Sequence, residues 1–525
     1  MQKAYIFRGS QYLRYDIPTD KVDDAPKPVD SWNRFPKDWN RINAGVTWDN
    51  GKIYFFRNDR YIRFDILKNR IDQRERPIRG NWPGMPESWT HFDAAINWGN
   101  GKAYFFHGSG YARYDISLDA FDQPSRRIHA DWNGFPSEWF HIDAAVNWGN
   151  GKAYLFHGTQ YVVYDVFGDR VISEQRTTSE FWHGVPAGWN SIDAIVTIDK
   201  KSEDMGARIE SLAGREAVGF GYVIYEGSRM TKRGSGGRRL INSEKEFPFT
   251  INTELGIGSI TKTLTAMSLL KRLSSKGLSV DDKIEPFLPR NWSRGPNIST
   301  ITFRELLTHT SGFRSGDDDY AGLKSMIAAG IMLANKVFEY RNPNFSLMRI
   351  LITSLRGITF SGTNADPLLA AGAYKLSMQE DVFEPSLVKG ADCRLNSLEI
   401  GFLYGPVQAP GDAYDYDDAD DSTMIAGAGG WKLTPLELAR TIHTFFTTER
   451  ILSAALRNQL ISEGLGTDSR GHKNGFWDNG EKGYCNTFFI FQDDVQCVFM
   501  SNSMYTDDMT WPEAIVESAH GHAFG

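Results

Sequence analysis

The chain has 525 residues, of which 41% are hydrophobic and 23% charged, and this composition excludes a mainly disordered or collagen-like protein. Its length predicts about two to four domains. A formal net charge of −7 does not favour nucleic acid or an anionic membrane as a partner. Without a run of 18 apolar residues we expect no membrane span, and three cysteines are too few for a disulfide framework. Because the first residues lack the apolar core of a secretory signal, we expect a cytoplasmic protein, or one released without a classical signal peptide.

The first 200 residues contain a repeat with a period of 50. Residues 92–104 recur almost unchanged as residues 142–154. Eleven of the 15 tryptophans occupy repeated positions, namely Trp32, Trp82, Trp132 and Trp182; Trp39, Trp89, Trp139 and Trp189; and Trp48, Trp98 and Trp148. The high aromatic content is therefore attributed to packing within and between the repeats.

Each repeat predicts three short strands, which in one unit are residues 93–98, 102–106 and 111–115. An Asn-Gly pair between the first two strands predicts a tight hairpin turn. Small residues in the first strand suit strands that crowd around a central axis. The sequence opens on a second strand, 3–7, and the missing first strand is found at 192–196, so we expect these two to pair. Four such sheets in a ring would form a β-propeller.

The repeat resembles the hemopexin-like domain, a four-bladed propeller, over residues 1–199. The resemblance implies a cation in the central channel, with Asn43, Asp93, Asp143 and Asp193 at the matching positions. Oxygen ligands suit Ca²⁺ or Na⁺. Alternatively, these side chains only satisfy turn amides. Heme is disfavoured, because His107 and His157 recur in register and therefore look like repeat loop residues.

After residue 199 the period disappears, and the charged stretch 199–204 is predicted to be a linker. The following residues mix strands and helices. The patterns predict strands at 219–225 and 487–491, and helices at 260–276, 345–355 and 435–446, with Gly277 as the C-terminal cap of the first helix.

The chemistry is concentrated where that first helix begins. Ser259 and Lys262 are three residues apart, so they share one face of a helix. A serine hydroxyl needs an adjacent base to become a nucleophile, and a lysine can be that base only if burial or a nearby cation lowers its pKa. The alternative is that Ser259 merely caps the helix.

Other motifs follow in a fixed order. Residues 306–313 read Leu-Leu-Thr-His-Thr-Ser-Gly-Phe, residues 340–342 Tyr-Arg-Asn, residues 427–431 Gly-Ala-Gly-Gly-Trp and residues 472–475 His-Lys-Asn-Gly. Together with Ser259-x-x-Lys262 this set resembles the serine β-lactamase and penicillin-binding-protein superfamily, in the branch of class C β-lactamases, DD-peptidases and esterases.

Two domains are therefore expected. The first, residues 1–199, would be an all-β four-bladed propeller. The second, residues 206–525, would be an α/β (mixed α+β) β-lactamase- or transpeptidase-like domain with a central antiparallel sheet flanked by helices.

The resemblance also implies roles in catalysis. Ser259 would be the nucleophile that forms an acyl-enzyme, and Lys262 would assist its deprotonation. Tyr340 would be a second base, activated by the nearby cations Lys262 and Lys473. Lys473 would also hold a substrate carboxylate.

Substrate contacts are implied as well. Asn342 would orient the amide of the acyl chain. The backbone amides of Ser259 and Phe476 would form the oxyanion hole. Two features depart from the family pattern, since bulky Phe476 stands where a small residue is usual and His472 competes with Lys473 for the functional role.

We expect a serine hydrolase or acyltransferase that acts on a small ester or amide without a cofactor for catalysis. Its propeller would be a binding module for a ligand or a protein partner. One alternative is a catalytically silent binding protein, and another is an effector or toxin whose propeller attaches to a partner. The acidic run 412–421 is interpreted as a solvated loop, with a preference for a cationic substrate as the alternative.

Overall fold

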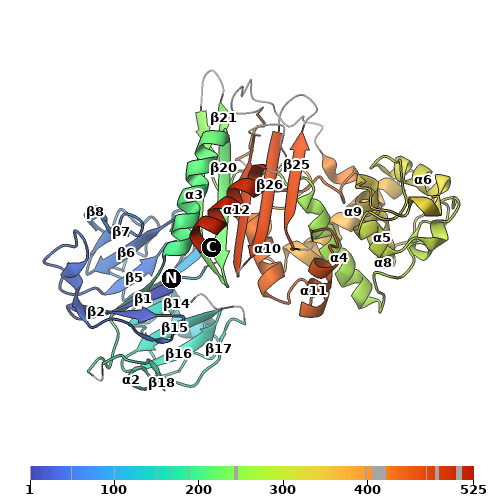
Figure 1. The fold of residues 1–525 in the computed structure, drawn as a ribbon. Coiled ribbons are helices and arrows are strands. Elements are labelled where there is room, and N and C mark those ends of the chain that lie inside the picture. The colour runs from blue at the N-terminus through green and yellow to red at the C-terminus, as the bar shows by residue number, and fades with distance from the viewer. Residues whose placement is uncertain are drawn as a thin grey trace. The chain divides into compact units, whose positions relative to one another are not determined.

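The computed structural model describes all residues except 1, 49, 100, 117, 149–150, 167, 187, 242–245, 396–398, 405–420, 469, 479–483, 493, 504–510 and 525. The chain divides into two compact units (Figure 1). The first comprises Met1–Ala207, Ile224–Arg233 and His522–Gly525, and the second Arg208–Val223 and Gly234–Gly521. The main division lies near the expected boundary, and two later segments also belong to the first unit.

The first unit is built from four sheets of antiparallel strand pairs that follow the 50-residue period. In spatial order they are β19 (Ala194–Asp199), β1 (Gln2–Arg8), β2 (Gln11–Asp16) and β3 (Lys21–Val22), with β4 (Lys27–Pro28) also on β2; β5 (Ala44–Thr47), β6 (Lys52–Arg57), β7 (Arg60–Asp65) and β8 (Arg70–Pro77); β9 (Ala94–Asn97), β10 (Lys102–His107), β11 (Gly110–Asp115) and β12 (Ala120–Phe121), with β13 (Arg126–Arg127) also on β11; and β14 (Ala144–Asn147), β15 (Lys152–His157), β16 (Gln160–Asp165) and β17 (Arg170–Val171), with β18 (Arg176–Thr177) also on β16. Short helical turns occur at η1 (Val29–Ser31), α1 (Ile128–Asp131) and α2 (Thr178–Phe181).

The innermost strands β5, β9, β14 and β19 contact one another in a closed ring. The predicted pairing of the two ends of the repeat region is confirmed, because β1 and β19 are antiparallel from Gln2 opposite Asp199 to Phe7 opposite Ala194. Apolar clusters fill the spaces between neighbouring sheets, and each contains one buried tryptophan of the Trp32, Trp82, Trp132 and Trp182 series. The repeated tryptophans thus explain the aromatic composition.

The connection between the first two strands of a repeat is longer than predicted. In the second sheet β5 ends at Thr47 and β6 begins at Lys52. The Trp48 amide donates to the Lys52 carbonyl over 2.7 Å, and Gly51 takes a positive φ of 75°. The predicted hairpin is confirmed, because β5 and β6 pair antiparallel with Thr47 opposite Ile53. Its loop runs from Trp48 to Lys52 and is therefore longer than a two-residue Asn-Gly turn. The Trp48 ring lies 5.9 Å from that of Trp82.

The second unit contains a six-stranded sheet in the order β22 (Glu246–Pro248), β21 (Arg229–Ile241), β20 (Gly219–Glu226), β27 (Val495–Ser501), β26 (Tyr484–Gln492) and β25 (Lys473–Asp478). Helices α3 (Lys200–Glu216) and α12 (Trp511–Phe524) lie along one face, and α4 (Ile260–Ser275) and α10 (Pro435–Thr447) lie on the other (Figure 1). The expected linker at 199–204 is wrong, because these residues end β19 and begin α3.

The predicted helix at 260–276 is confirmed as α4. Its stripe of Leu264, Met267, Leu270 and Leu273 is buried, and Gly277 follows it with a φ of 68°. The helix predicted at 345–355 is divided into α7 (Asn342–Ser346) and α8 (Met348–Leu355).

The remaining elements complete the second unit. They are β23 (Leu255–Gly256), β24 (Lys432–Leu433), α5 (Phe303–Leu307), α6 (Tyr320–Ala329), α9 (Asp366–Met378), α11 (Ala454–Ser462), η2 (Glu285–Phe287), η3 (Ile298–Thr300), η4 (Leu333–Asn335), η5 (Gln379–Phe383) and η6 (Ser422–Met424). Within the parts of the chain that the structure describes, no helix combines the length and apolarity needed to cross a membrane.

Candidate active site

Ser259 stands immediately before the first residue of α4. The glycine before it, Gly258, has a φ of 50°, which places the serine on a tight turn. Although Ser259 is the N-cap residue, its side chain makes no capping hydrogen bond. The structure therefore does not support a capping role, and the hydroxyl instead contacts Lys262 and Tyr340.

Lys262 lies one turn further along α4 and is almost fully buried, with 1% of its surface exposed. Its Nζ is 3.0 Å from Ser259 Oγ, 2.9 Å from Asn342 Oδ1 and 2.8 Å from the Ala428 carbonyl. Burial lowers the pKa of Lys262 well below its usual value, and the positive charge of Lys473 lowers it further. In the neutral amine the two carbonyl acceptors take both N–H groups, so the lone pair faces the serine hydroxyl.

Tyr340 approaches the same hydroxyl from the other side, with its phenol oxygen 2.6 Å from Ser259 Oγ. The Nζ atoms of Lys262 and Lys473 lie over its ring, 4.9 and 5.8 Å from the centroid. We expected these cations to make the phenol more acidic. Burial instead raises the pKa of Tyr340, and it outweighs the lowering effect of the hydrogen bond between Tyr340 and Ser259. The phenol is therefore protonated at neutral pH.

Lys473 and His472 both line the cleft but point to different partners. Burial lowers the pKa of Lys473 to about 8. His472 is 3% exposed, and its Nε2 lies 3.4 Å from the Phe491 carbonyl. The positive charge of Lys473 acts on Lys262, whose pKa it lowers. Phe476 belongs to β25, and its side chain lies outside the described residues.

Gly475 allows β25 to pack against the turn that carries Ser259. A Cβ on Gly475 would lie 2.0 Å from the Ile257 carbonyl oxygen and 3.2 Å from Ile260 Cγ1. Any side chain here would separate the strand from this turn. An oxyanion hole formed by the backbone amides of Ser259 and Phe476 stays a prediction.

His309 is a site residue to which the sequence reasoning assigned no role. Its ring packs on Tyr340, with centroids 4.5 Å apart and an interplanar angle of 31°. Its Nδ1 accepts a hydrogen bond from the Arg341 amide over 3.2 Å. Burial lowers the pKa of His309 to about 3, so the ring is neutral. Its position inside the motif at 306–313 could have indicated that His309 belongs to the site.

The cleft around these groups has a volume of about 1050 Å³. Besides Ser259, Tyr340 and Lys473 it is lined by apolar side chains, namely Leu307, Phe338 and Phe488, and by carboxylates, namely Glu463, Asp468 and Glu513. These carboxylates pair with Arg304 or Arg470. The acidic run 412–421 is outside the described residues except for Asp421, which pairs with Arg394. A buried base, a hydroxyl and a phenol within hydrogen-bond reach suit acyl transfer.

The four predicted cation ligands each accept a hydrogen bond from a hairpin amide. The bonds run from Asn58 N to Asn43 Oδ1 (2.9 Å), from Gly108 N to Asp93 Oδ2 (2.7 Å), from Gly158 N to Asp143 Oδ2 (2.6 Å) and from Gly9 N to Asp193 Oδ2 (2.6 Å). These are the turn contacts of the alternative interpretation. A Ca²⁺ or Na⁺ ion bound by these four residues stays a prediction.

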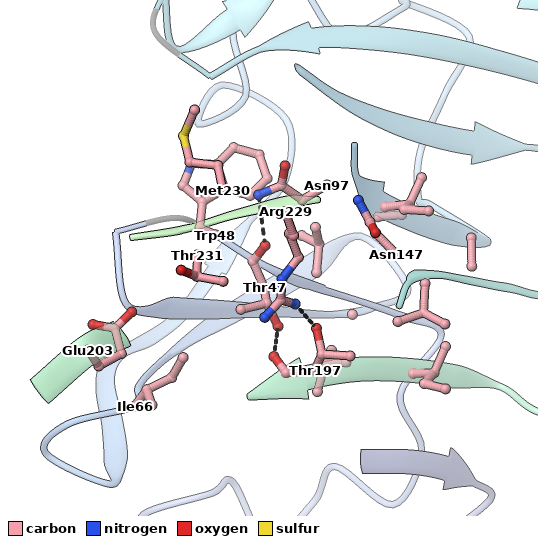
Figure 2. A pocket seen from close by; sticks show the side chains of 18 residues that line it. Thr47, Trp48, Ile66, Asn97, Asn147, Thr197, Glu203, Arg229, Met230 and Thr231 are labelled. Carbon is pink, nitrogen blue, oxygen red and sulfur yellow. Dashed lines mark hydrogen bonds between the residues drawn. The ribbon is translucent and has the colours of Figure 1, made fainter. Parts of the chain in front are cut away.

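A small cavity lies among the innermost strands of the first unit (Figure 2). Its volume is about 30 Å³, and its lining includes four polar residues at equivalent repeat positions, Thr47, Asn97, Asn147 and Thr197. Arg229, which also belongs to this unit, reaches into the cavity and donates to Thr197 Oγ1. A guanidinium therefore supplies positive charge inside the ring of strands, and the cavity is too small for an organic ligand.

The comparisons with known proteins agree with this description. The family model for Beta-lactamase matches residues 207–520, and the model for Hemopexin matches residues 42–87, 92–137 and 142–187. The chain therefore belongs to the β-lactamase family, and it carries hemopexin repeats in its N-terminal part.

Individual relatives are distant. PbpX of Bacillus subtilis (strain 168), which is named as a penicillin-binding protein, is 28% identical over 146 residues, which are 26% of this chain and 35% of PbpX. The chain spans between 35% and 48% of the length of the curated relatives it matches. FmtA from Staphylococcus aureus is 17% identical with a TM-score of 0.49, covering 62% of this chain and 87% of FmtA. A D-amino acid amidase from Ochrobactrum anthropi SV3 is 16% identical with a TM-score of 0.47, covering 62% of this chain and all of the amidase.

Proposed function

We propose that this protein is a serine hydrolase or acyltransferase that forms an acyl-enzyme on Ser259 with a small ester or amide. The observation that carries the proposal is the position of Ser259 Oγ, 3.0 Å from the buried amine of Lys262 and 2.6 Å from the phenol of Tyr340. A nucleophile, a base and an acid within hydrogen-bond reach are the minimum for acyl transfer.

In this proposal Lys262 is the general base. Its lowered pKa provides neutral amine, and its two carbonyl partners direct the lone pair at the serine hydroxyl. Ser259 Oγ attacks the substrate carbonyl carbon while its proton passes to Lys262 Nζ. The backbone amides of Ser259 and Phe476 receive the negative charge that develops on the carbonyl oxygen.

Tyr340 is the acid in the second half of the step. When the bond between the acyl carbon and the leaving group breaks, the phenol gives its proton to the departing nitrogen or oxygen and regains one from Lys262. Water, or another acceptor, then attacks the acyl-serine ester and returns the enzyme to its starting state. In this proposal Lys473 holds a carboxylate of the substrate and Asn342 orients the amide of its acyl chain, because both residues line the cleft that contains Ser259.

For the first unit we infer a four-bladed propeller that acts as a binding module. The ring of inner strands and the repeat of one sheet every 50 residues support this inference. The inference is independent of the hydrolase proposal, because the lining of the small cavity and the lining of the catalytic cleft share no residue.

The proposal is tested by covalent labelling of the full chain. The protein is treated with a fluorophosphonate and, separately, with a fluorescent penicillin, and the intact mass is measured. We expect one adduct on Ser259 that is absent in Ser259→Ala. A panel of p-nitrophenyl esters then shows whether the acyl group is released to water.

One further variant refines the result. Tyr340→Phe keeps the ring but removes the acid, so we expect the fluorophosphonate adduct to form while turnover of an amide, whose leaving nitrogen must be protonated, falls about a hundredfold or more. A folded wild-type protein that takes up neither probe and cleaves no ester would contradict the proposal and favour a silent binding protein.

A further inference from the structure

Two neighbouring sheets of the first unit each place two imidazoles around one carboxylate. The first cluster is His91, Asp93 and His107, and the second is His141, Asp143 and His157. Within each cluster the candidate ligand atoms lie within 4.8 Å of one another. The two clusters are equivalent under the 50-residue repeat, so the same arrangement is built twice by the fold.

The separations inside a cluster are close to those of a metal site. His91 Nε2 lies 3.2 Å from Asp93 Oδ1, and His107 Nδ1 lies 3.8 Å from Asp93 Oδ2. In the second cluster His141 Nε2 lies 3.1 Å from Asp143 Oδ1. Around a tetrahedral ion with bonds of about 2.0–2.1 Å, ligand atoms are separated by roughly 3.3 Å. Small side-chain rotations would therefore complete the geometry.

One imidazole nitrogen in each cluster has no hydrogen-bond partner. His107 Nδ1 and His157 Nδ1 are buried atoms without a partner within the described part of the chain. Buried polar atoms are normally satisfied, so an unpartnered nitrogen near a carboxylate requires an explanation. A cation between the nitrogen and the carboxylate would satisfy both groups.

The ligands are also held in place by their neighbours. The ring of His107 packs 5.3 Å from that of Trp89, and the ring of His157 packs 5.1 Å from that of Trp139. The Gly108 and Gly158 amides fix the two carboxylates, as described above. In the first cluster Thr90 Oγ1 lies 3.0 Å from His91 Nδ1, so it can accept that N–H and turn the Nε2 lone pair toward Asp93.

The other two sheets show what replaces the imidazoles. At the positions equivalent to His91 and His107, the second sheet has Arg41 and Arg57, and Arg41 pairs with Asp193 of the first sheet over 3.1 Å. Asp193 therefore has a permanent cation. Among the described residues no lysine or arginine pairs with Asp93 or Asp143. Besides the Gly108 and Gly158 amides, imidazoles are the groups that contact these two carboxylates among the described residues.

We propose that the two clusters are binding sites for a divalent transition-metal ion of the Zn²⁺, Co²⁺ or Ni²⁺ class. Imidazole nitrogen selects these ions over Ca²⁺ or Na⁺, which prefer oxygen ligands. Three protein ligands leave further coordination positions to water or to an oxygen or nitrogen of a partner. The first site binds more tightly than the second, because residue 140, which corresponds to Thr90, is a phenylalanine that cannot orient His141.

The test uses the untagged full chain, stripped of metal and titrated with CoCl₂. The visible d–d absorption of Co²⁺ reports on nitrogen coordination, and metal analysis after dialysis gives the stoichiometry. We expect two ions per chain that excess Ca²⁺ does not displace. The variants His107→Ala and His157→Ala should each bind one ion, and the double variant none. Because both rings pack on tryptophans, His91→Ala and His141→Ala serve as second variants with more exposed side chains.

Histidines of the same unit outside the clusters provide matched controls. His129→Ala and His183→Ala should bind two ions with an unchanged absorption spectrum. Near-ultraviolet circular dichroism shows whether each variant keeps its tryptophan packing. Fewer than one ion per wild-type chain, or equal binding by wild type and the folded double variant, would overturn the proposal, and so would displacement of Co²⁺ by Ca²⁺.

Discussion

The partners of Lys262 determine how the reaction responds to pH. Two carbonyl oxygens and one hydroxyl surround its amine, and burial together with Lys473 lowers its pKa below 10.5. The reactive form is the neutral amine, so its fraction increases as the pH rises through the pKa of Lys262 in the folded protein.

We expect the rate of Ser259 acylation to rise with pH along a limb centred well below 10.5. At higher pH the rate should fall again when Tyr340 ionises, and this second limb lies above pH 10 because burial raises the pKa of the phenol. Stopped-flow acylation with a p-nitroanilide, whose leaving nitrogen must be protonated, measures both limbs. Lys262→Arg keeps a positive charge at all pH values, so it should lose about 10²–10⁴-fold in rate without recovery at high pH. A wild-type pH profile in this variant would show that Lys262 is not the base.

His309 is a positioning residue, because its neutral ring packs on Tyr340 and contacts the Arg341 amide. His309→Asn tolerates the positive φ of 56° but removes the stacked ring. We expect kcat for ester hydrolysis to fall about tenfold to a hundredfold with little change in KM. Labelling of Ser259 by a fluorophosphonate, which needs no leaving-group acid from Tyr340, should be nearly unchanged. Equal losses in labelling and turnover would indicate a general structural defect instead.

Gly475 in the edge strand β25 packs closely against the turn that precedes α4. Gly475→Ala would put a methyl group 2.0 Å from the Ile257 carbonyl, so the strand must move away from the nucleophile turn. We expect a loss of about 1–3 kcal/mol in the free energy of unfolding together with loss of acylation.

The matched control for Gly475→Ala is Gly372→Ala in α9. A Cβ at this position meets nothing within 4 Å, so we expect a stabilisation of about 0.5–1 kcal/mol and unchanged acylation. Urea unfolding and ester hydrolysis, measured on both variants, check the pair. Normal acylation in Gly475→Ala would mean that the oxyanion hole does not depend on this contact.

The elements also show which features the sequence could predict. The 50-residue period, the buried stripe of α4 and the strand pairing between 3–7 and 192–196 depend on repeated or periodic side chains, so they were predicted correctly. The hairpin between β5 and β6 was also predicted correctly, but the length of its loop was not.

Some features of the candidate site could also be predicted from the sequence, and others could not. Ser259, Lys262, Tyr340 and Lys473 could be named from motif order. Ser259, Tyr340 and Lys473 line one cleft, and Lys262 is buried beside Ser259. The carbonyl of Ala428 and the raised pKa of Tyr340 could not be predicted, because both depend on which groups exclude water around the site.

The first unit as a whole includes the buried pair of Lys232 and Glu203, whose Nζ and Oε2 atoms are 2.9 Å apart. Lys232→Ala leaves the carboxylate without this ammonium, so we expect a loss of about 3 kcal/mol in the stability of this unit. Most tryptophans belong to the repeats, and their fluorescence therefore reports on this unit during urea unfolding. Lys68→Ala is the control, because its pair with Asp65 spans 3.6 Å and its side chain is 61% exposed. It should change stability by less than about 1 kcal/mol. Equal effects of the two variants would contradict the burial argument.

The pairing of β1 with β19 has a consequence for how this protein folds during synthesis. The first residues of the chain must wait for their strand partner until residues 194–199 have left the ribosome. Closing a loop of this length lowers the entropy of the chain before the contacts between the two strands form. Such long-range pairing therefore slows folding. Until closure, the edge of β1 exposes unpaired backbone groups to other nascent chains. The closed ring covers the edge of β1 in the folded protein. During synthesis this edge stays unpaired for a long time, and the chain can then associate wrongly with other chains.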